Sequence, residues 1–257
     1  MGLEKILNNF KSKKILVIGD AIIDSYLWGE INRMSPEAPV PVVDVKVNQN
    51  DNRLGGAANV ALNLKELGAK AILCTVIGND SKGILFEQLM KEQGLGVEGM
   101  LISDGRKTTT KTRVIVKDRH QLRIDEEDKH PIKIEKQFLN LVIKVSKNID
   151  AIILQDYNKG VLTKNIITKL INYANENNIP TIVDPKKDNF LSYKNCTLFK
   201  PNLHEISEGL QQEINPENLK KKPNDNISIY TADDANELDD NKWDSIRRYS
   251  ITDKETR

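Results

Sequence analysis

Carboxylates follow three short apolar runs of the chain, at positions where their side chains could bind a ligand. Asp20 comes after KILVIG, Asp156 after AIILQ and Asp184 after TIV. Because the carboxyl ends of parallel strands meet at one edge of a sheet, we expect these three side chains to gather there. Asp24 adds a carboxylate close to Asp20, and such a pair suits a polyol, whose vicinal hydroxyl groups donate hydrogen bonds. A loop turn with a helix N-cap is the alternative.

The stretch Gly55-Gly56-Ala57-Ala58-Asn59 could bind a phosphate group or a sugar hydroxyl. Two glycines at the start of a helix let a ligand approach the backbone closely. The first turn of that helix offers free N–H groups and a partial positive charge. A tight turn with small residues for packing is the alternative, and the motif alone does not decide between the two.

Lys111 and Arg113 lie two residues apart in a β-branched stretch, so their side chains are expected on one face of a strand. Two cations that face a sugar site could hold a phosphate group already present on the substrate. An exposed strand that uses both cations for solubility is the alternative.

Asn202 and Glu205 follow an apolar run and stand three apart, so they meet on one face of a helical turn. Magnesium prefers oxygen ligands and keeps several waters, so Glu205 could hold it through a water molecule beside a nucleotide phosphate. The alternative is a helix that begins with an N-cap Asn202 and a capping-box Glu205. His204 is expected to be a surface residue rather than a ligand.

Strand-like runs alternate with helical segments of ten to fifteen residues. This order predicts an α/β fold, a doubly wound and mostly parallel sheet. Two stretches, near 33–47 and 108–125, read instead as half-exposed strands of a small lid. The expected strands are 14–18, 39–47, 71–77, 108–116, 151–154, 181–183 and 197–199, with a loop after 18, and the expected helices are 55–67, 81–93, 134–147 and 163–177.

The composition narrows the class of protein. A formal net charge of +1 in 257 residues gives no general attraction to nucleic acid or anionic lipid. No run approaches the ~18 apolar residues of a membrane span, and the N-terminus lacks the apolar core of a signal peptide. We therefore expect a cytoplasmic protein without nucleic-acid or membrane partners. Cys74 and Cys196 are expected to be buried free thiols.

Taken together, the motifs resemble those of the ribokinase-like (PfkB) carbohydrate kinases. Within that family the chain is most similar to the heptose 7-phosphate kinases, which often form the N-terminal half of a bifunctional enzyme of ADP-heptose synthesis. The resemblance covers about residues 10–215, and the run from Arg33 to Val43 is its most specific part. The matching stretches are 19–43, 55–69, 111–115, 121–127, 155–163, 183–186 and 200–205.

The resemblance implies a ribokinase-like fold, ATP and Mg²⁺ as cofactors, and transfer of a phosphoryl group to C1 of D-glycero-D-manno-heptose 7-phosphate in lipopolysaccharide core synthesis. It also implies a possible homodimer through the lid strands. The residues implied for the sugar are Asp20, Asp24, Gly55, Gly56 and Asn59, those for the 7-phosphate are Lys111 and Arg113, and those for ATP and magnesium are Asp184, Lys186, Asn202 and Glu205.

Family members carry a Gly-Ala-Gly-Asp motif whose Asp is the general base, and no such motif occurs here, since Gly209 is the last glycine. No catalytic base is therefore assigned. We expect an incomplete kinase domain over 1–219, with the C-terminal part of the fold missing, and a polar, acidic tail over 220–257. The alternative function is an inactive, truncated kinase or pseudokinase that binds sugar phosphate without turnover.

Overall fold

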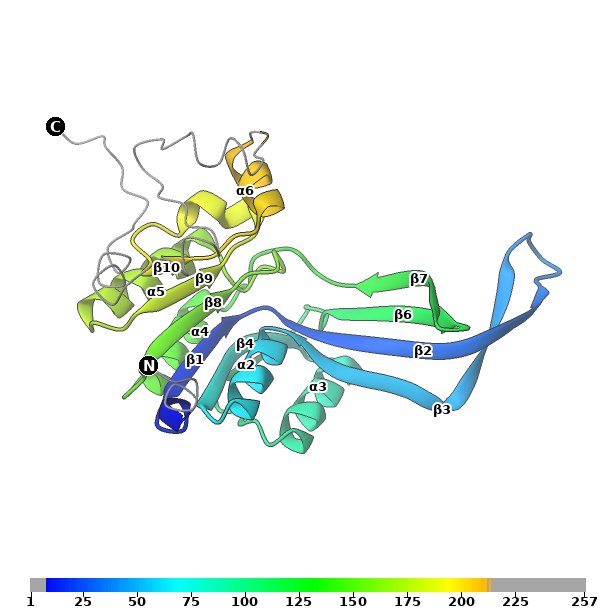
Figure 1. Cartoon of the computed structure of the whole chain (residues 1–257), viewed down its shortest axis with the longest axis horizontal. Coiled ribbons are helices and arrows are strands. Elements are labelled where there is room, and N and C mark those ends of the chain that lie inside the picture. The colour runs from blue at the N-terminus through cyan, green and yellow to red at the C-terminus, as the bar shows by residue number, and fades with distance from the viewer. Residues whose placement is uncertain (1–7, 212, 214–257) are drawn as a thin grey trace.

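The central element is a six-stranded parallel sheet, and the computed structural model describes it within residues 8–211 and 213 (Figure 1). Its strand order is β10-β9-β8-β1-β4-β5. The neighbours pair in parallel throughout, which requires a crossover between each strand and the next. The strands are β1 (Lys14–Gly19), β4 (Lys70–Gly78), β5 (Met100–Ser103), β8 (Ala151–Gln155), β9 (Thr181–Asp184) and β10 (Leu198–Phe199).

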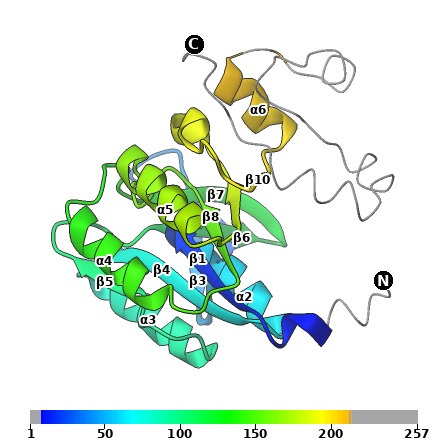
Figure 2. The same cartoon turned by 90° about the vertical axis from the view of Figure 1, so that its left-hand side faces the viewer.

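Helices cover both faces of this sheet (Figure 2). The helices are α2 (Ala57–Glu66), α3 (Ser81–Glu92), α4 (Glu135–Val145), α5 (Lys164–Glu176) and α6 (Leu203–Leu210), with a 3₁₀ helix η1 (Lys187–Ser192). In β1, Leu16 and Ile18 pack with α4 and α5, whereas Val17 packs with α2 and α3. Since side chains alternate along a strand, β1 contributes to two separate cores. The predicted doubly wound sheet is confirmed.

A four-stranded lid projects from the carboxyl end of the parallel sheet (Figure 1). Its strand order is β3-β2-β6-β7, and β2 lies parallel to β6 while the outer pairs are antiparallel. The lid strands are β2 (Ala21–Met34), β3 (Pro41–Gly56), β6 (Thr110–Val116) and β7 (Arg119–Glu126). The lid predicted near 33–47 and 108–125 is therefore present, and it is larger than the sequence indicated.

The loop predicted after 18 is wrong, because β2 begins at Ala21, one residue after Asp20. Its first residues are buried against the cores and its last residues are exposed in the lid, so no single apolar–polar alternation runs through it. Strand β5 was likewise not predicted, whereas β7 falls in the lid stretch predicted near 108–125. Cys74 and Cys196 are free and buried, as expected. Among the described residues, no helix is long and apolar enough to cross a membrane.

Candidate functional site

The expected gathering of carboxylates is confirmed at the carboxyl edge of the sheet. Gly19 at the end of β1 pairs with Gln155 at the end of β8, and Gln155 pairs with Asp184 at the end of β9. Asp20 and Asp156 follow the first two strands directly. They are close enough that the charge of Asp20 raises the pKa of Asp156.

Asp20 binds the loop after β8. Its Oδ2 accepts from the backbone N–H groups of Tyr157 and Lys159 at 2.9 and 3.1 Å, and its Oδ1 accepts from Val161 at 3.0 Å. The side chain is 1% exposed, and burial raises its pKa while these three donors oppose the rise. In this conformation both oxygens face the loop, and contact between Asp20 and a sugar stays a prediction.

Asp156 holds the segment around η1. Its Oδ2 accepts from Tyr193 Oη at 2.7 Å and Asn189 Nδ2 at 3.0 Å, and its Oδ1 accepts from Asn158 N at 2.8 Å. Burial, followed by the charge of Asp20, raises the pKa of Asp156 from 3.8 to about 6. A buried carboxyl of this kind is nearly half charged at pH 6, at a cost in stability.

The raised pKa predicts a specific pH dependence. Protons bound by folded Asp156 stabilise the fold fully below pH 3.8, and this stability is lost as the pH rises through about 6. Between pH 4 and 7, the free energy of unfolding should fall by roughly 2–3 kcal/mol more in the wild type than in Asp156→Asn. Urea unfolding at each pH measures this difference, and parallel curves for the two proteins would contradict it.

The predicted glycine motif lies where β3 runs into α2. Gly56 has φ of +58°, in the left-handed region, and a Cβ atom there would come within 2.4 Å of the Asp20 backbone oxygen. A Cβ atom on Gly55 would come within 2.3 Å of Asp24 Oδ2. Both positions therefore need glycine for reasons of space, and Gly55 leaves room for a carboxylate predicted to bind sugar.

A cavity of about 530 Å³ lies between the lid base and helices α2 and α3. It brings together Asp24 and Asn59 of the predicted sugar site, while Gly55 lies directly beneath Asp24. The remaining lining is half polar and half apolar. The lining residues are Asp24, Tyr26, Asp51, Asn52, Arg53, Leu54, Asn59, Leu62, Leu89 and Gln93.

Two guanidinium groups contact the ring of Tyr26, and one of them, that of Arg53, lines this cavity. The Cζ atom of Arg53 lies 5.1 Å from the ring centroid, and that of Arg113 lies 5.3 Å away. Arg113 Nη1 donates to Asp24 Oδ1 at 2.6 Å, and Arg53 Nε donates to Asp51 at 2.8 Å. Arg53 was missed from the sequence because the strand that carries it was expected to be too short.

Lys111 belongs to a second group of charges on the same face of the lid. It stands opposite Asp125 of β7, and Lys159 Nζ lies 2.6 Å from Glu127 Oε2 just beyond the end of that strand. Burial, then the charge of Lys159, lowers the pKa of Lys111. Lys159 is 8% exposed and was not predicted, since its role depends on contacts with residues far away in the sequence.

The residues predicted for ATP lie at the carboxyl end of β9 and in the segments that follow it. Asp184 accepts from Gln155 Nε2 at 2.5 Å and pairs with Lys200 Nζ at 3.0 Å. Lys186 pairs with Glu205, and its Nζ lies 5.8 Å from the centre of the Tyr157 ring. Burial works against the charged form of Lys186, but Glu205 and Asp184 together raise its pKa. A partly exposed cation above an aromatic ring suits a nucleotide phosphate.

Asn202 and Glu205 form a capping box at the start of α6. Asn202 Oδ1 accepts from Glu205 N at 2.9 Å, and Glu205 Oε2 accepts from Asn202 N at 2.9 Å. The capping alternative is therefore present, and it engages the Asn202 side-chain oxygen and one Glu205 oxygen but not the Nδ2 group of Asn202. His204 is exposed, with its Nε2 3.5 Å from Glu208.

The described residues do not form a metal cage. No group of three or more His, Cys, Asp or Glu side chains in that part of the chain could hold a metal ion. Both oxygens of Glu205 are occupied, by Lys186 and by the backbone of Asn202. The side chains near Glu205 therefore fit a divalent ion only where nucleotide phosphates and water supply most of its ligands, as is common for magnesium.

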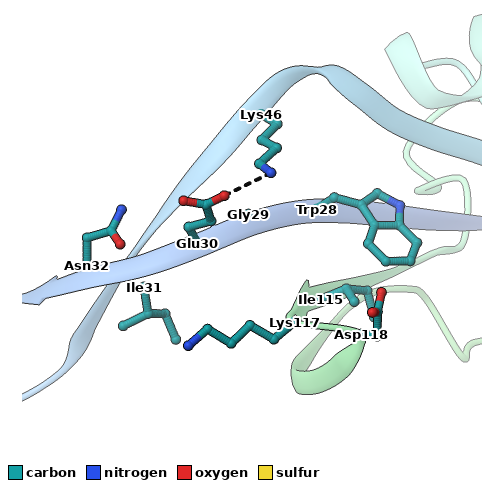
Figure 3. A pocket seen from close by; sticks show the side chains of 9 residues that line it. All are labelled: Trp28, Gly29, Glu30, Ile31, Asn32, Lys46, Ile115, Lys117 and Asp118. Atoms are coloured by element: carbon teal, nitrogen blue, oxygen red, sulfur yellow. Dashed lines mark ion pairs between the residues drawn. The ribbon is translucent and has the colours of Figure 1, made fainter.

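A second cavity of about 470 Å³ lies in the outer half of the lid, away from the predicted residues (Figure 3). Lys46 pairs with Glu30 across it at 2.9 Å. Trp28 and Ile115 supply apolar walls, while the side chain of Lys117 extends past Ile31. No residue predicted for sugar, phosphate or nucleotide lines this cavity.

Comparison with known proteins agrees with this arrangement. The family model described as "pfkB family carbohydrate kinase" matches residues 12–229. The chain belongs to this family. Its members use ATP with a divalent metal ion. The match continues past the domain boundary predicted at 219. That boundary and the tail over 220–257 stay predictions, since they lie outside the described residues.

Curated relatives extend the similarity over most of the chain. "Bifunctional protein HldE" of Helicobacter pylori strain J99 is 42% identical over 212 residues, which are 81% of this chain and 45% of the relative. The protein of the same name from Sulfurimonas denitrificans is 40% identical over 233 residues, 88% of this chain and 48% of the relative. The chain thus spans about half the length of the curated relatives it matches.

Solved structures support the fold. Escherichia coli phosphofructokinase-2, in complex with substrates and products, gives a TM-score of 0.60 at 18% identity, over 81% of this chain and 67% of that one. A carbohydrate kinase from Agrobacterium tumefaciens gives 0.55 at 19% identity, over 77% of this chain and 63% of that one. At these identities the likeness establishes the pfkB kinase fold alone.

Proposed function

We propose that this chain uses ATP to phosphorylate the C1 hydroxyl group of D-glycero-D-manno-heptose 7-phosphate, giving the 1,7-bisphosphate for ADP-heptose and lipopolysaccharide core synthesis. The observation that carries the proposal is the cavity that joins Asp24, Asn59 and Arg53 at the ring of Tyr26, while the guanidinium group of Arg113 contacts the same ring and pairs with Asp24. Hydroxyl groups and a phosphate on one molecule would match such a lining. Similarity to proteins named HldE adds support.

The residues would act mainly by positioning and charge. Asp24 would accept hydrogen bonds from sugar hydroxyls, and Asn59 would both accept hydrogen bonds from them and donate to them. Lys111 and Arg113 would neutralise the 7-phosphate. Lys186, with Asp184 nearby, would face the nucleotide phosphates, where a divalent ion bound with ATP supplies charge neutralisation. Phosphoryl transfer needs little covalent help from a protein, so such preorganised groups supply most of the rate enhancement.

A heptose-dependent ADP-release assay with magnesium tests the proposal, using Glu205→Gln. Gln keeps the capping-box acceptor but removes the charge opposite Lys186, so turnover should fall about 10²-fold or more. Glu208→Gln, an exposed neighbour on the same helix, is the matched control and should change turnover less than about twofold. Equal rates for the two variants would contradict the role of Glu205.

A second candidate function is sugar-phosphate binding without turnover. It is favoured by the absence of any Gly-Ala-Gly-Asp stretch in the 257 residues. For this candidate, heptose 7-phosphate should raise the melting temperature while no ADP forms. Heptose-dependent ADP formation that Glu205→Gln reduces would exclude it.

We also propose that two chains associate through the lid strands. Large apolar side chains are exposed there, including Leu122 and Ile124 on edge strand β7 and Met34, Val40 and Val45 on the hairpin that carries the cavity of Figure 3. Light scattering should give twice the 29.1 kDa chain mass for the wild type and 29.1 kDa for Leu122→Glu/Ile124→Glu. Leu191→Glu, exposed in η1, should leave the dimer intact. A wild type of single-chain mass would contradict the proposal.

The cytoplasmic location of the protein stays a prediction.

A further inference from the structure

Arg53 lies in the sheet beside the residues of the candidate sugar site. In the strand register, Arg53 of β3 stands opposite Asp24 of β2, and Asp24 stands opposite Lys111 of β6. One row further along, Tyr26 stands between Asp51 and Arg113. Because residues two apart on a strand share a face, all six side chains lie on one face of the lid.

The two arginines differ from Lys111 in what they contact. Arg53 and Arg113 both approach the ring of Tyr26, at 5.1 and 5.3 Å, whereas Lys111 stands with Lys159 and Asp125. Arg53 lines the 530 Å³ cavity and Lys111 does not. The cation that shares Tyr26 with Arg113, and faces the cavity, is therefore Arg53.

Arg53 keeps hydrogen-bonding capacity toward the cavity. Its Nε and Nη2 groups donate to Asp51 Oδ2, and within the part of the chain that the structure describes its Nη1 group has no partner. Arg113 uses Nη1 on Asp24 and on the Lys111 carbonyl oxygen, and among the described residues its Nη2 group has no partner. The side chain of Arg53 is 64% exposed, so an incoming anion can reach it. A guanidinium group presents several donors in a planar fork, which matches the oxygens of a phosphate group.

We propose that Arg53, acting with Arg113 across Tyr26, is the residue that selects a phosphorylated sugar over the corresponding free sugar. The inference deepens the proposed function and rests on it for the position of the sugar at Asp24 and Asn59. Arg53 contributes to binding the phosphate group and leaves the sugar hydroxyls to the other residues. Its loss therefore lowers affinity for the phosphorylated sugar alone.

Calorimetry with the full chain tests this selection without requiring turnover. The probes are D-glycero-D-manno-heptose 7-phosphate, fructose 6-phosphate and the two unphosphorylated sugars. For whichever sugar binds, Arg53→Gln should raise the Kd of the phosphorylated form about 10- to 100-fold and that of the free sugar less than about twofold. Arg53→Lys should retain part of the selectivity, since it keeps a charge. Arg33→Gln, an arginine exposed at the far end of β2, is the matched control and should behave as the wild type.

The outcomes separate the inference from the proposed function. If only fructose 6-phosphate binds and Arg53→Gln weakens it selectively, the heptose substrate is wrong and the role of Arg53 stands. If Arg53→Gln leaves the ratio of the two Kd values within about twofold of the wild type, the inference is overturned even where heptose phosphate binds. Equal loss of phosphorylated and free sugar would also overturn it, because it would indicate a structural role. A wild type that binds none of the probes overturns both.

Discussion

Replacement of Asp20 by Ala is expected to lower the free energy of unfolding by about 3–5 kcal/mol. The carboxylate accepts three backbone N–H groups of the loop 157–161 in a buried position, and the variant leaves all three donors without a partner. Buried donors without partners cost free energy individually, and here they lie in one short loop. Chemical denaturation measures the loss, and amide hydrogen exchange should quicken in that loop first.

Asp150→Ala is a matched control for this prediction. Asp150 also accepts a backbone N–H group, from Lys14 at 2.8 Å, and pairs with Lys13, but it is partly exposed. Water can replace its hydrogen bonds, so the variant should lose only about 1 kcal/mol. Similar losses for the two variants, or unchanged exchange in 157–161, would show that Asp20 does not organise that loop.

The position of Asp20 was predictable from the sequence, and its contacts were not. An aspartate after a buried strand predicts a place at the sheet edge, because strand order and direction follow from local pattern. The donors that Asp20 binds come 137 to 141 residues later in the chain. No sequence pattern indicates hydrogen bonds between residues so far apart. From the sequence, the only alternative to sugar binding by Asp20 was therefore a turn or a helix cap.

Asn202 and Glu205 illustrate the opposite case. Their interaction spans three residues, so sequence spacing alone predicts the capping box that forms. The same spacing also suggested a magnesium-water contact, because both interpretations need two oxygen-bearing side chains on one helical turn. Glu205 also pairs with Lys186, nineteen residues away. The sequence spacing gave no indication of this charged contact.

The lid was underestimated for a physical reason. Strand β2 starts buried between two cores and ends in solvent, so its apolar residues follow its surroundings rather than a period of two. Strand β3 continues from the predicted segment up to the glycine motif, which places Arg53 in the sheet beside Asp24. The predicted cations Lys111 and Arg113 do share a face, but different neighbours surround them.

Replacement of Gly56 by Ala is expected to lower the free energy of unfolding by about 2–4 kcal/mol. Gly56 joins β3 to α2 with φ of +58°, and the new methyl group would lie 2.4 Å from the Asp20 backbone oxygen. That oxygen accepts the Ala57 N–H group at 3.0 Å, so the start of α2 would shift together with Asp20. Thermal or chemical denaturation measures the loss, and binding of sugar phosphate should weaken with it.

Gly105→Ala separates the two causes of that loss. Gly105 has φ of +69° and no atom within 4 Å of its added methyl group, so it carries the cost of a left-handed conformation alone, about 1–2 kcal/mol. The excess loss in Gly56→Ala is then the combined cost of the contacts with Asp20 and Ile22 and of the ψ of −136° that Gly56 adopts. If the two variants lose equal stability, backbone conformation alone explains why position 56 is glycine. The close approach of β3 to the end of β1 would then not be the reason for a glycine there.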